Sequence, residues 1–359
     1  MGAKSKIYLI FVVLAGMCWG TYIPMVAQGG KELKSSYASF LCVGVAYFLI
    51  AILLPVAILW ARGKMPARNA GGILFATLAG VAGALGALCV ILAVFEFNGP
   101  RIFVAPVIFA LAPVINTLVS LFWHPDEGAL AFGLPRERPH WTLYVGIVCA
   151  GTGAGLALLA KELTEAAHAK PPEGIPIYLA FVILAGLCWG TYVPMIAQGG
   201  KQLKSSYASF LCVGVAYFVI AILFPMAVFI VKGFPSFNPT GTTLATLAGA
   251  AGAVGALCVI FATFEFKGPR IYVAPVIFAL APVIATLVSL FWHPATGKYA
   301  LLFALPDEPP HWTLYIGIVL AGAGSGLVLF AKELTESRHA AAKSAAAPVP
   351  TPAVEPAKP

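Results

Sequence analysis

The side chains best suited to hold a bound molecule occur in two copies of one short motif. Each copy has a tryptophan followed closely by threonine, tyrosine and proline, with a glutamine just beyond. They are Trp19, Thr21, Tyr22, Pro24 and Gln28 in the first copy and Trp189, Thr191, Tyr192, Pro194 and Gln198 in the second. Indole and phenol rings offer stacking faces, and hydroxyl and amide groups offer hydrogen bonds. The motif therefore indicates a cavity for a polar molecule, with ordinary helix packing as the alternative.

The motif belongs to a long internal repeat. Residues 11–50 and 181–220 align without gaps and differ at six of forty positions. Five of the six differences exchange one apolar residue for another, and the sixth sets Glu32 against Gln202. The chain is therefore one unit written twice, and its elements have to be read in pairs.

Asn116 is a polar residue present in one copy only, because its counterpart is Ala285. If both copies line one shared cavity, Asn116 is a donor and acceptor contributed by one side, as a solute without twofold symmetry requires. An Asn that hydrogen-bonds a neighbouring helix is the alternative.

Charged residues lie only at the ends of the apolar segments or beyond them. Four of them, Glu96, Arg101, Glu265 and Arg270, stand just at the ends. Ionisable groups inside a membrane normally mark ion paths. Their absence favours an uncharged solute, or coupling and gating through these end residues only; solvated helix ends, with each Glu paired to its Arg, are the alternative.

Enzymatic and metal chemistry are not expected. No apolar segment carries a nucleophile with a base or a pair of carboxylates. The seven cysteines lie inside apolar runs and the six histidines in loops or tails, without the spacing of a metal site. We therefore expect a protein that is not an enzyme and has no cofactor.

Prolines supply a second indication of a site. A proline inside a helix removes one backbone N–H and frees a carbonyl. Matching prolines stand in both copies, and they predict helix breaks at Pro24, Pro106, Pro113, Pro194, Pro275 and Pro282. Broken helices at equivalent places are typical of a transporter's midplane site, and simple kinks are the alternative.

The composition is that of an integral membrane protein. Hydrophobic residues make up 60% of the chain and charged residues 10%, and the mean hydropathy is +0.91. The net charge of +8 is interpreted as loop charge facing anionic lipid. No arginine-rich segment with interleaved aromatics suggests nucleic acid.

The periodicity and length of the apolar runs predict an all-α membrane fold. Ten runs are close to the roughly 20 residues that cross a bilayer. They are 7–27, 37–60, 72–95, 102–123, 141–159, 177–197, 207–231, 243–264, 271–292 and 312–330. We predict a first five-helix repeat in residues 1–165, a second in 166–339 and a disordered Ala/Pro/Lys-rich tail in 340–359.

Loop charge predicts the orientation. With the N-terminus in the cytoplasm, 15 of the 22 Lys and Arg residues fall on the cytoplasmic side, which favours both termini inside. Because each copy has an odd number of spans, the second copy enters the membrane from the opposite side. The expected architecture is two inverted repeats, as in secondary transporters, in the cell (inner) membrane.

This pattern resembles the drug/metabolite transporter (EamA-like) superfamily. The similarity covers about residues 7–333 and rests on the Trp-Gly pair and proline of the first helix and on Ala-Pro-x6-Pro in the fourth. WGTYIPMVAQGG is similar to the first helix of the glucose/ribose and rhamnose porter branches. The superfamily also includes exporters of amino acids and other metabolites and nucleotide-sugar exchangers.

The sequence and the resemblance together predict an alternating-access transporter of a small, polar, mostly uncharged solute, with a sugar first. An exporter of amino acids, drugs or other metabolites is the alternative. A non-transporting membrane scaffold or receptor would instead have a dry, fully packed interface between the halves. The expected partners are the solute and membrane lipid, while proton coupling, homo-oligomers, the direction of transport and the solute's identity stay open.

Overall fold

The computed structural model describes residues 7–63, 69–97, 99, 101–124, 131–134, 138–165, 177–268, 270–292 and 311–345. Within these ranges all regular elements are helices, and the extended pairing is limited to an isolated bridge between Trp123 and Phe132. The prediction of an all-α protein is confirmed.

The helices fall into two matching series. The first comprises α1 (Ile7–Leu33), α2 (Ser36–Tyr47) continued by the π-helix η2 (Phe48–Leu53) and α3 (Leu54–Ala61), α4 (Ala70–Ile91) continued by the π-helix η3 (Leu92–Glu96), α5 (Arg101–Phe122) and α6 (Thr142–Glu165). The second comprises α7 (Tyr178–Leu203), α8 (Ser206–Tyr217) with η4 (Phe218–Leu223) and α9 (Phe224–Lys232), α10 (Pro239–Ile260) with η5 (Phe261–Glu265), α11 (Arg270–Phe291) and α12 (Thr313–Ala345).

Local sequence explains where several helices begin. The side chains of Ser35 and Ser205 accept hydrogen bonds from the backbone N–H groups of Ala38 and Ala208 at the starts of α2 and α8. Asn69 and Asn238 cap α4 and α10 in the same way. Short polar side chains at this position satisfy N–H groups that have no partner inside the helix.

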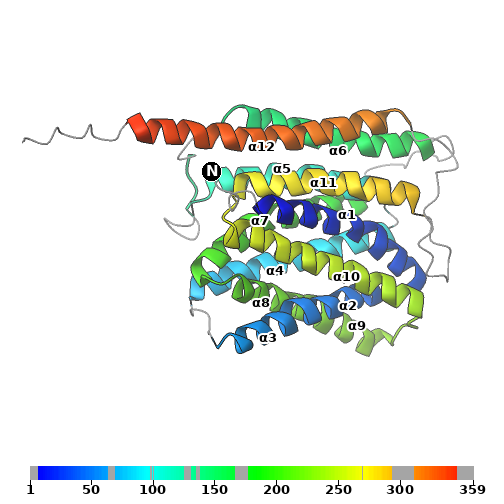
Figure 1. Ribbon diagram of the computed structural model, residues 1–359. Coiled ribbons are helices and arrows are strands. Elements are labelled where there is room, and N and C mark those ends of the chain that lie inside the picture. The colour runs from blue at the N-terminus through cyan, green and yellow to red at the C-terminus, as the bar shows by residue number, and fades with distance from the viewer. Residues whose placement is uncertain are drawn as a thin grey trace, which may run out of the picture.

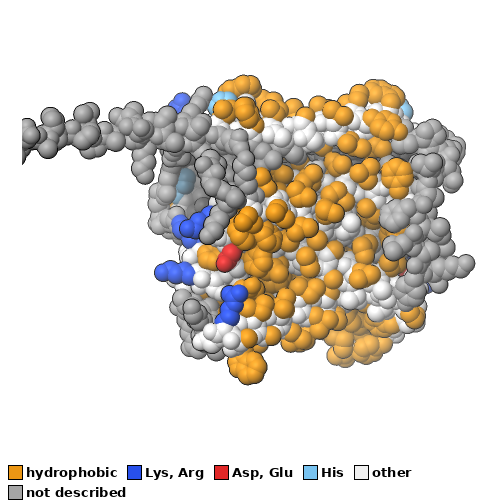
Figure 2. All heavy atoms as spheres, viewed as in Figure 1, with side chains coloured by type: hydrophobic (Ala, Val, Ile, Leu, Met, Phe, Trp, Pro, Cys, Tyr) orange, Lys and Arg blue, Asp and Glu red, His pale blue; other side chains and the backbone are white. Residues whose placement is uncertain are grey.

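Six helices are long and apolar enough to cross a membrane. They are Ile7–Leu33, Ser36–Ala61, Ala70–Glu96, Tyr178–Leu203, Ser206–Lys232 and Pro239–Glu265. Figure 2 shows the corresponding surface, which is dominated by hydrophobic side chains, with Lys and Arg gathered toward one edge of this face. The chain is a multi-pass membrane protein by these criteria.

Two sequence expectations differ from the observed helices. The predicted breaks at Pro24, Pro106, Pro113, Pro194, Pro275 and Pro282 are not interruptions, because α1, α5, α7 and α11 continue past them. A proline removes one hydrogen bond, and packing by neighbouring helices keeps the rest. At the C-terminus α12 reaches Ala345, so residues 340–345 of the expected disordered tail are helical, as their alanine content favours; the rest of the tail lies outside the described residues.

The helices stack in layers that mix the two series (Figure 1). In this view α6 and α12 form the top layer, α5 and α11 the next, then α1 and α7, then α4 and α10, with α2, α3, α8 and α9 at the bottom. Each layer thus combines equivalent helices from both copies. The core lies between the layers and includes Phe109 and Phe278 from α5 and α11.

Contacts between the two series are reciprocal. Gly29 of α1 approaches Ala245 of α10, and the equivalent Gly199 of α7 approaches Ala76 of α4. Reciprocity of this kind is the mark of a twofold interface.

Two equivalent helices also cross each other directly. Gly44 of α2 approaches Ala221, and Gly214 of α8 approaches Ala51. The earlier residue of each segment therefore contacts the later residue of the other segment. α2 and α8 therefore run antiparallel where they cross.

Candidate functional site

A cavity lies between the two series and takes the same five positions from each. Its lining residues are Trp19, Tyr22, Tyr47, Gly83 and Ala87 from the first and Trp189, Tyr192, Tyr217, Gly252 and Ala256 from the second. The empty space measures about 420 Å³ with its open side included, and the room inside suits a few water molecules. None of the ten lining residues is charged.

The two tryptophans are held by the glycine-rich helices of the opposite series. Nε1 of Trp19 donates to the carbonyl of Gly252 at 3.3 Å, and Nε1 of Trp189 donates to the carbonyl of Gly83 at 3.3 Å. A buried indole N–H needs such a partner. Both predicted tryptophans thus line the cavity with fixed orientations.

Space for these indoles exists only because glycine stands beside each. A Cβ atom added to Gly255 would overlap the indole of Trp19, and one added to Gly86 would overlap that of Trp189. The glycines of α4 and α10 therefore shape the cavity as well as pack the helices.

Tyrosines complete the aromatic walls. Trp19 lies 6.0 Å from Tyr192 and Tyr22 lies 6.3 Å from Trp189 between ring centroids, both edge to face. Tyr47 and Tyr217 stack in parallel with 3.5 Å between centroids. The pair of Tyr47 and Tyr217 was not predicted from the sequence. The pattern that could have indicated it is a tyrosine repeated at the middle of the second apolar run of each copy.

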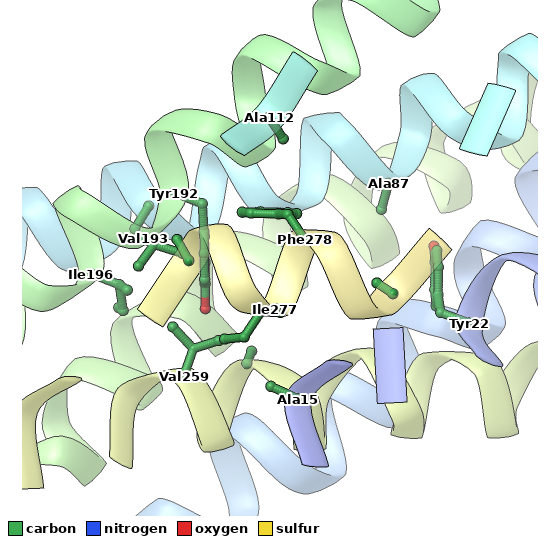
Figure 3. Packing of buried hydrophobic residues seen from close by; sticks show 14 of the residues in the cluster. Ala15, Tyr22, Ala87, Ala112, Tyr192, Val193, Ile196, Val259, Ile277 and Phe278 are labelled. Carbon is green, nitrogen blue, oxygen red and sulfur yellow. The ribbon is translucent and has the colours of Figure 1, made fainter. Parts of the chain in front are cut away.

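Two tyrosines that line the cavity have a buried hydroxyl without a hydrogen-bond partner among the described residues. Tyr22 and Tyr192 are buried, and the Oη atom of each is inaccessible and unpaired. Figure 3 shows the two tyrosines on either side of Phe278. An unpaired buried polar group costs about 1–3 kcal/mol, so these hydroxyls suit a molecule with hydrogen-bonding groups.

The predicted threonines and glutamines lie elsewhere. The hydroxyl of Thr21 donates to the carbonyls of Met17 and Cys18, and Thr191 does the same one repeat later. Gln28 donates to Oε1 of Glu32 at 3.0 Å, whereas Oε1 of the buried Gln198 has no partner. None of the four lines the cavity.

Asn116 is fully buried on α5, with 0% of its surface exposed. Among the residues that the structure describes, neither Oδ1 nor Nδ2 of Asn116 has a hydrogen-bond partner, so the alternative of a bond to a neighbouring helix is not observed there. Asn116 is not among the residues that line the cavity.

The predicted charged residues occupy matching helix ends. Ser36 donates to Oε2 of Glu96 at 2.7 Å, and Ser206 donates to Oε2 of Glu265 at 2.7 Å. Both carboxylates are exposed. Arg101 and Arg270 begin α5 and α11, and their side chains lie outside the described residues.

Comparison with known proteins bears on the fold alone. No protein-family model and no curated protein matches the chain. A solved structure described as "Crystal structure of protein" is similar, with a TM-score of 0.56 and 17% sequence identity over 91% of this chain and 98% of that one. The helical arrangement therefore occurs in another protein of nearly the same extent.

Proposed function

We propose that the chain is an alternating-access transporter of a small, polar, mostly uncharged solute, with a sugar as the first choice. The observation that carries the proposal is the central cavity, whose aromatic walls come equally from both series and hold two unpaired hydroxyls. The cavity is also the feature that a scaffold with a dry, packed interface lacks.

The chemistry of the lining supports the choice of solute. Aromatic faces pack against apolar C–H surfaces, and the hydroxyls of Tyr22 and Tyr192 offer hydrogen bonds to a solute's own hydroxyls. A lining without charge offers a desolvated ion no side chain of opposite charge to pair with. The apolar walls also fit the runner-up, an exporter of amino acids, drugs or other metabolites.

Ten membrane spans arranged as two inverted repeats in the cell membrane, with both termini cytoplasmic, are part of this proposal. The antiparallel crossing of α2 and α8 supports it, because equivalent helices of inverted copies point in opposite directions. The resemblance to the drug/metabolite transporter superfamily is consistent with this arrangement. Exchange of conformations between two such halves exposes one cavity alternately to each side.

Uptake into proteoliposomes tests the function. The purified chain is reconstituted and supplied with panels of labelled sugars and amino acids. Tyr22→Phe with Tyr192→Phe should raise the KM of the true solute by about 5- to 150-fold, since each of the two hydrogen bonds contributes about 0.5–1.5 kcal/mol. The control is Tyr315→Phe, an exposed tyrosine of α12. Accumulation of no solute, or equal kinetics in the double variant and the control, contradicts the proposal.

A further inference from the structure

A second cavity lies next to the central one, within the first series. It is apolar, measures about 260 Å³ and lies between α1 and the end of α4. It is lined by Ile23, Val26, Ala27, Gly30, Val90, Ile91, Val94 and Phe95. The central cavity uses Tyr22 and Ala87 of the same two helices. The two spaces therefore follow one another along α1 and α4.

At the far end of this second cavity, the aromatic ring of Phe95 lies against Gly30. A Cβ atom placed on Gly30 would lie 3.6 Å from Cδ2 of Phe95. The equivalent contact exists in the other series, where a Cβ atom on Gly200 would lie 3.3 Å from Cγ of Phe264. Each series thus has a phenylalanine packed against the backbone of its first helix, beyond the central cavity.

We propose that Phe95 and Phe264 are the two gates of a single solute path, one at each side of the membrane. The proposal rests on the transport function proposed above. In this proposal the second cavity is the part of the solute path that lies between the central cavity and Phe95.

The positions of the two contacts along α10 support this assignment. Gly29, next to the first gate, lies beside Ala245, the central cavity includes Gly252 and Ala256, and the second gate residue is Phe264. At about 1.5 Å per residue, Ala245 and Phe264 are about 28 Å apart along the helix. This is close to the roughly 30 Å thickness of a bilayer's hydrocarbon core, and the cavity lies between them.

Both gate residues stand on π-helical turns. Phe95 belongs to η3 and Phe264 to η5, and the N–H groups of Phe97 and Phe266 donate to carbonyls five residues earlier, at 2.9 Å each. A π-turn contains one residue more than an α-turn and often marks a functional site. Its conversion to α-helix rotates the residues on one side of it by about 100° relative to the other, enough to withdraw a ring from its glycine.

Sided thiol labelling tests the gates without knowledge of the solute. The seven native cysteines are replaced, and Ala256→Cys places one thiol in the central cavity. A membrane-impermeant thiol reagent is then applied to one face of the vesicles at a time. Phe95→Ala should speed labelling from the face of Lys31 by about tenfold, and Phe264→Ala from the face of Lys201, a change equal to about 1.4 kcal/mol.

The control is Phe330→Ala, which removes an exposed ring of α12 and should leave the rates unchanged. A second design closes the other gate: a Cβ on Gly200 would lie 3.4 Å from that of Phe264, near the roughly 3.5–4.5 Å of a disulfide. Gly200→Cys with Phe264→Cys, oxidised before labelling, should block the reagent from the Lys201 face until a reductant is added.

Three results would contradict the assignment of the gates. They are unchanged labelling rates in both alanine variants, faster labelling from the same face in both, and labelling that is equally fast with and without the disulfide. The result also separates this inference from the proposed function. A protein that labels through its gates but accumulates none of the solutes has the path without that transport activity. A protein that transports a sugar while both gate variants label as before has the activity with a different path.

Discussion

The two halves of the molecule are identical in the central cavity and differ away from it. All five pairs that line the cavity match in type, from Trp19 with Trp189 to Ala87 with Ala256. Polar differences between the halves, such as Asn116 against Ala285, Glu32 against Gln202 and Val94 against Thr263, involve no residue that lines the central cavity. The cavity is therefore symmetric in chemistry, and only residues outside it can distinguish one half from the other.

This comparison has a physical basis in the reciprocal contacts. Trp19 bonds to the carbonyl of Gly252 in the other half, and Trp189 bonds to that of Gly83. A change in one tryptophan or one glycine alters the partner half as well. Equivalent substitutions in the two halves should therefore have equal effects near the cavity and unequal effects elsewhere.

The largest effect is expected from Gly255→Ala and, equally, Gly86→Ala. The added methyl group overlaps the indole of Trp19 or Trp189. Overpacking of this kind costs about 1–3 kcal/mol, and displacement of the indole should abolish uptake. Thermal unfolding in detergent and proteoliposome uptake measure the two losses. Gly151→Ala is the control, since nothing lies within 4 Å of its Cβ position. A clear difference in stability or uptake between Gly255→Ala and Gly86→Ala would contradict the expected symmetry of the two halves.

The next effect separates the halves. Asn116→Ala, which copies Ala285, should raise the free energy of unfolding by about 1 kcal/mol, because it removes a buried amide whose two polar atoms lack partners. Ala285→Asn should lower it. Thermal unfolding measures both. Because Asn116 does not line the central cavity, Asn116→Ala should leave membrane insertion and the uptake rate unchanged, and slower uptake would place Asn116 on the solute's path.

A smaller and symmetric effect is expected at the helix ends. Ser36→Ala and Ser206→Ala each remove one hydrogen bond to an exposed carboxylate, Glu96 or Glu265. Each should lower the free energy of unfolding by about 0.5–1.5 kcal/mol and speed labelling of the cavity from one face. Unequal losses in thermal unfolding would mean that the two ends are held differently.

The smallest effect is expected from Glu32→Gln, which makes the two first helices alike at this position. Gln28 donates to Oε1 of Glu32 at the helix end. Because an amide can also accept this bond, thermal stability should change by a few tenths of a kcal/mol at most. The informative measurement is the ratio of uptake to efflux rates, which should shift if Glu32 distinguishes the two faces. An unchanged ratio would assign the difference between the faces to other residues.

Several residues of the site could be predicted from the sequence, each for its own physical reason. Trp19, Tyr22 and their partners were predicted because a polar aromatic cluster in mid-segment is costly unless it meets a partner or a cavity. Thr21 and Gln28 were predicted on the same grounds, but a threonine in a helix can bond to its own preceding turn, as Thr21 does with Met17. Sequence spacing alone does not separate the two outcomes.

The pair Tyr47 and Tyr217 shows what was missed. Neither tyrosine is distinctive within its own helix, and the two rings stack only because α2 and α8 cross. Prolines were interpreted as breaks, whereas the departures from α-helical hydrogen bonding are π-turns such as η3 and η5.

The amino-acid sequence by itself determined that this chain is helical, apolar and written twice, because hydropathy and self-similarity are properties of local composition and order. It also determined that no charge lies in the middle of the apolar segments. Only the tertiary structure decided which copies of which residues meet. Contacts between helices such as α1 and α10 join residues more than two hundred positions apart, and the room for an indole beside Gly255 exists only once the helices have packed.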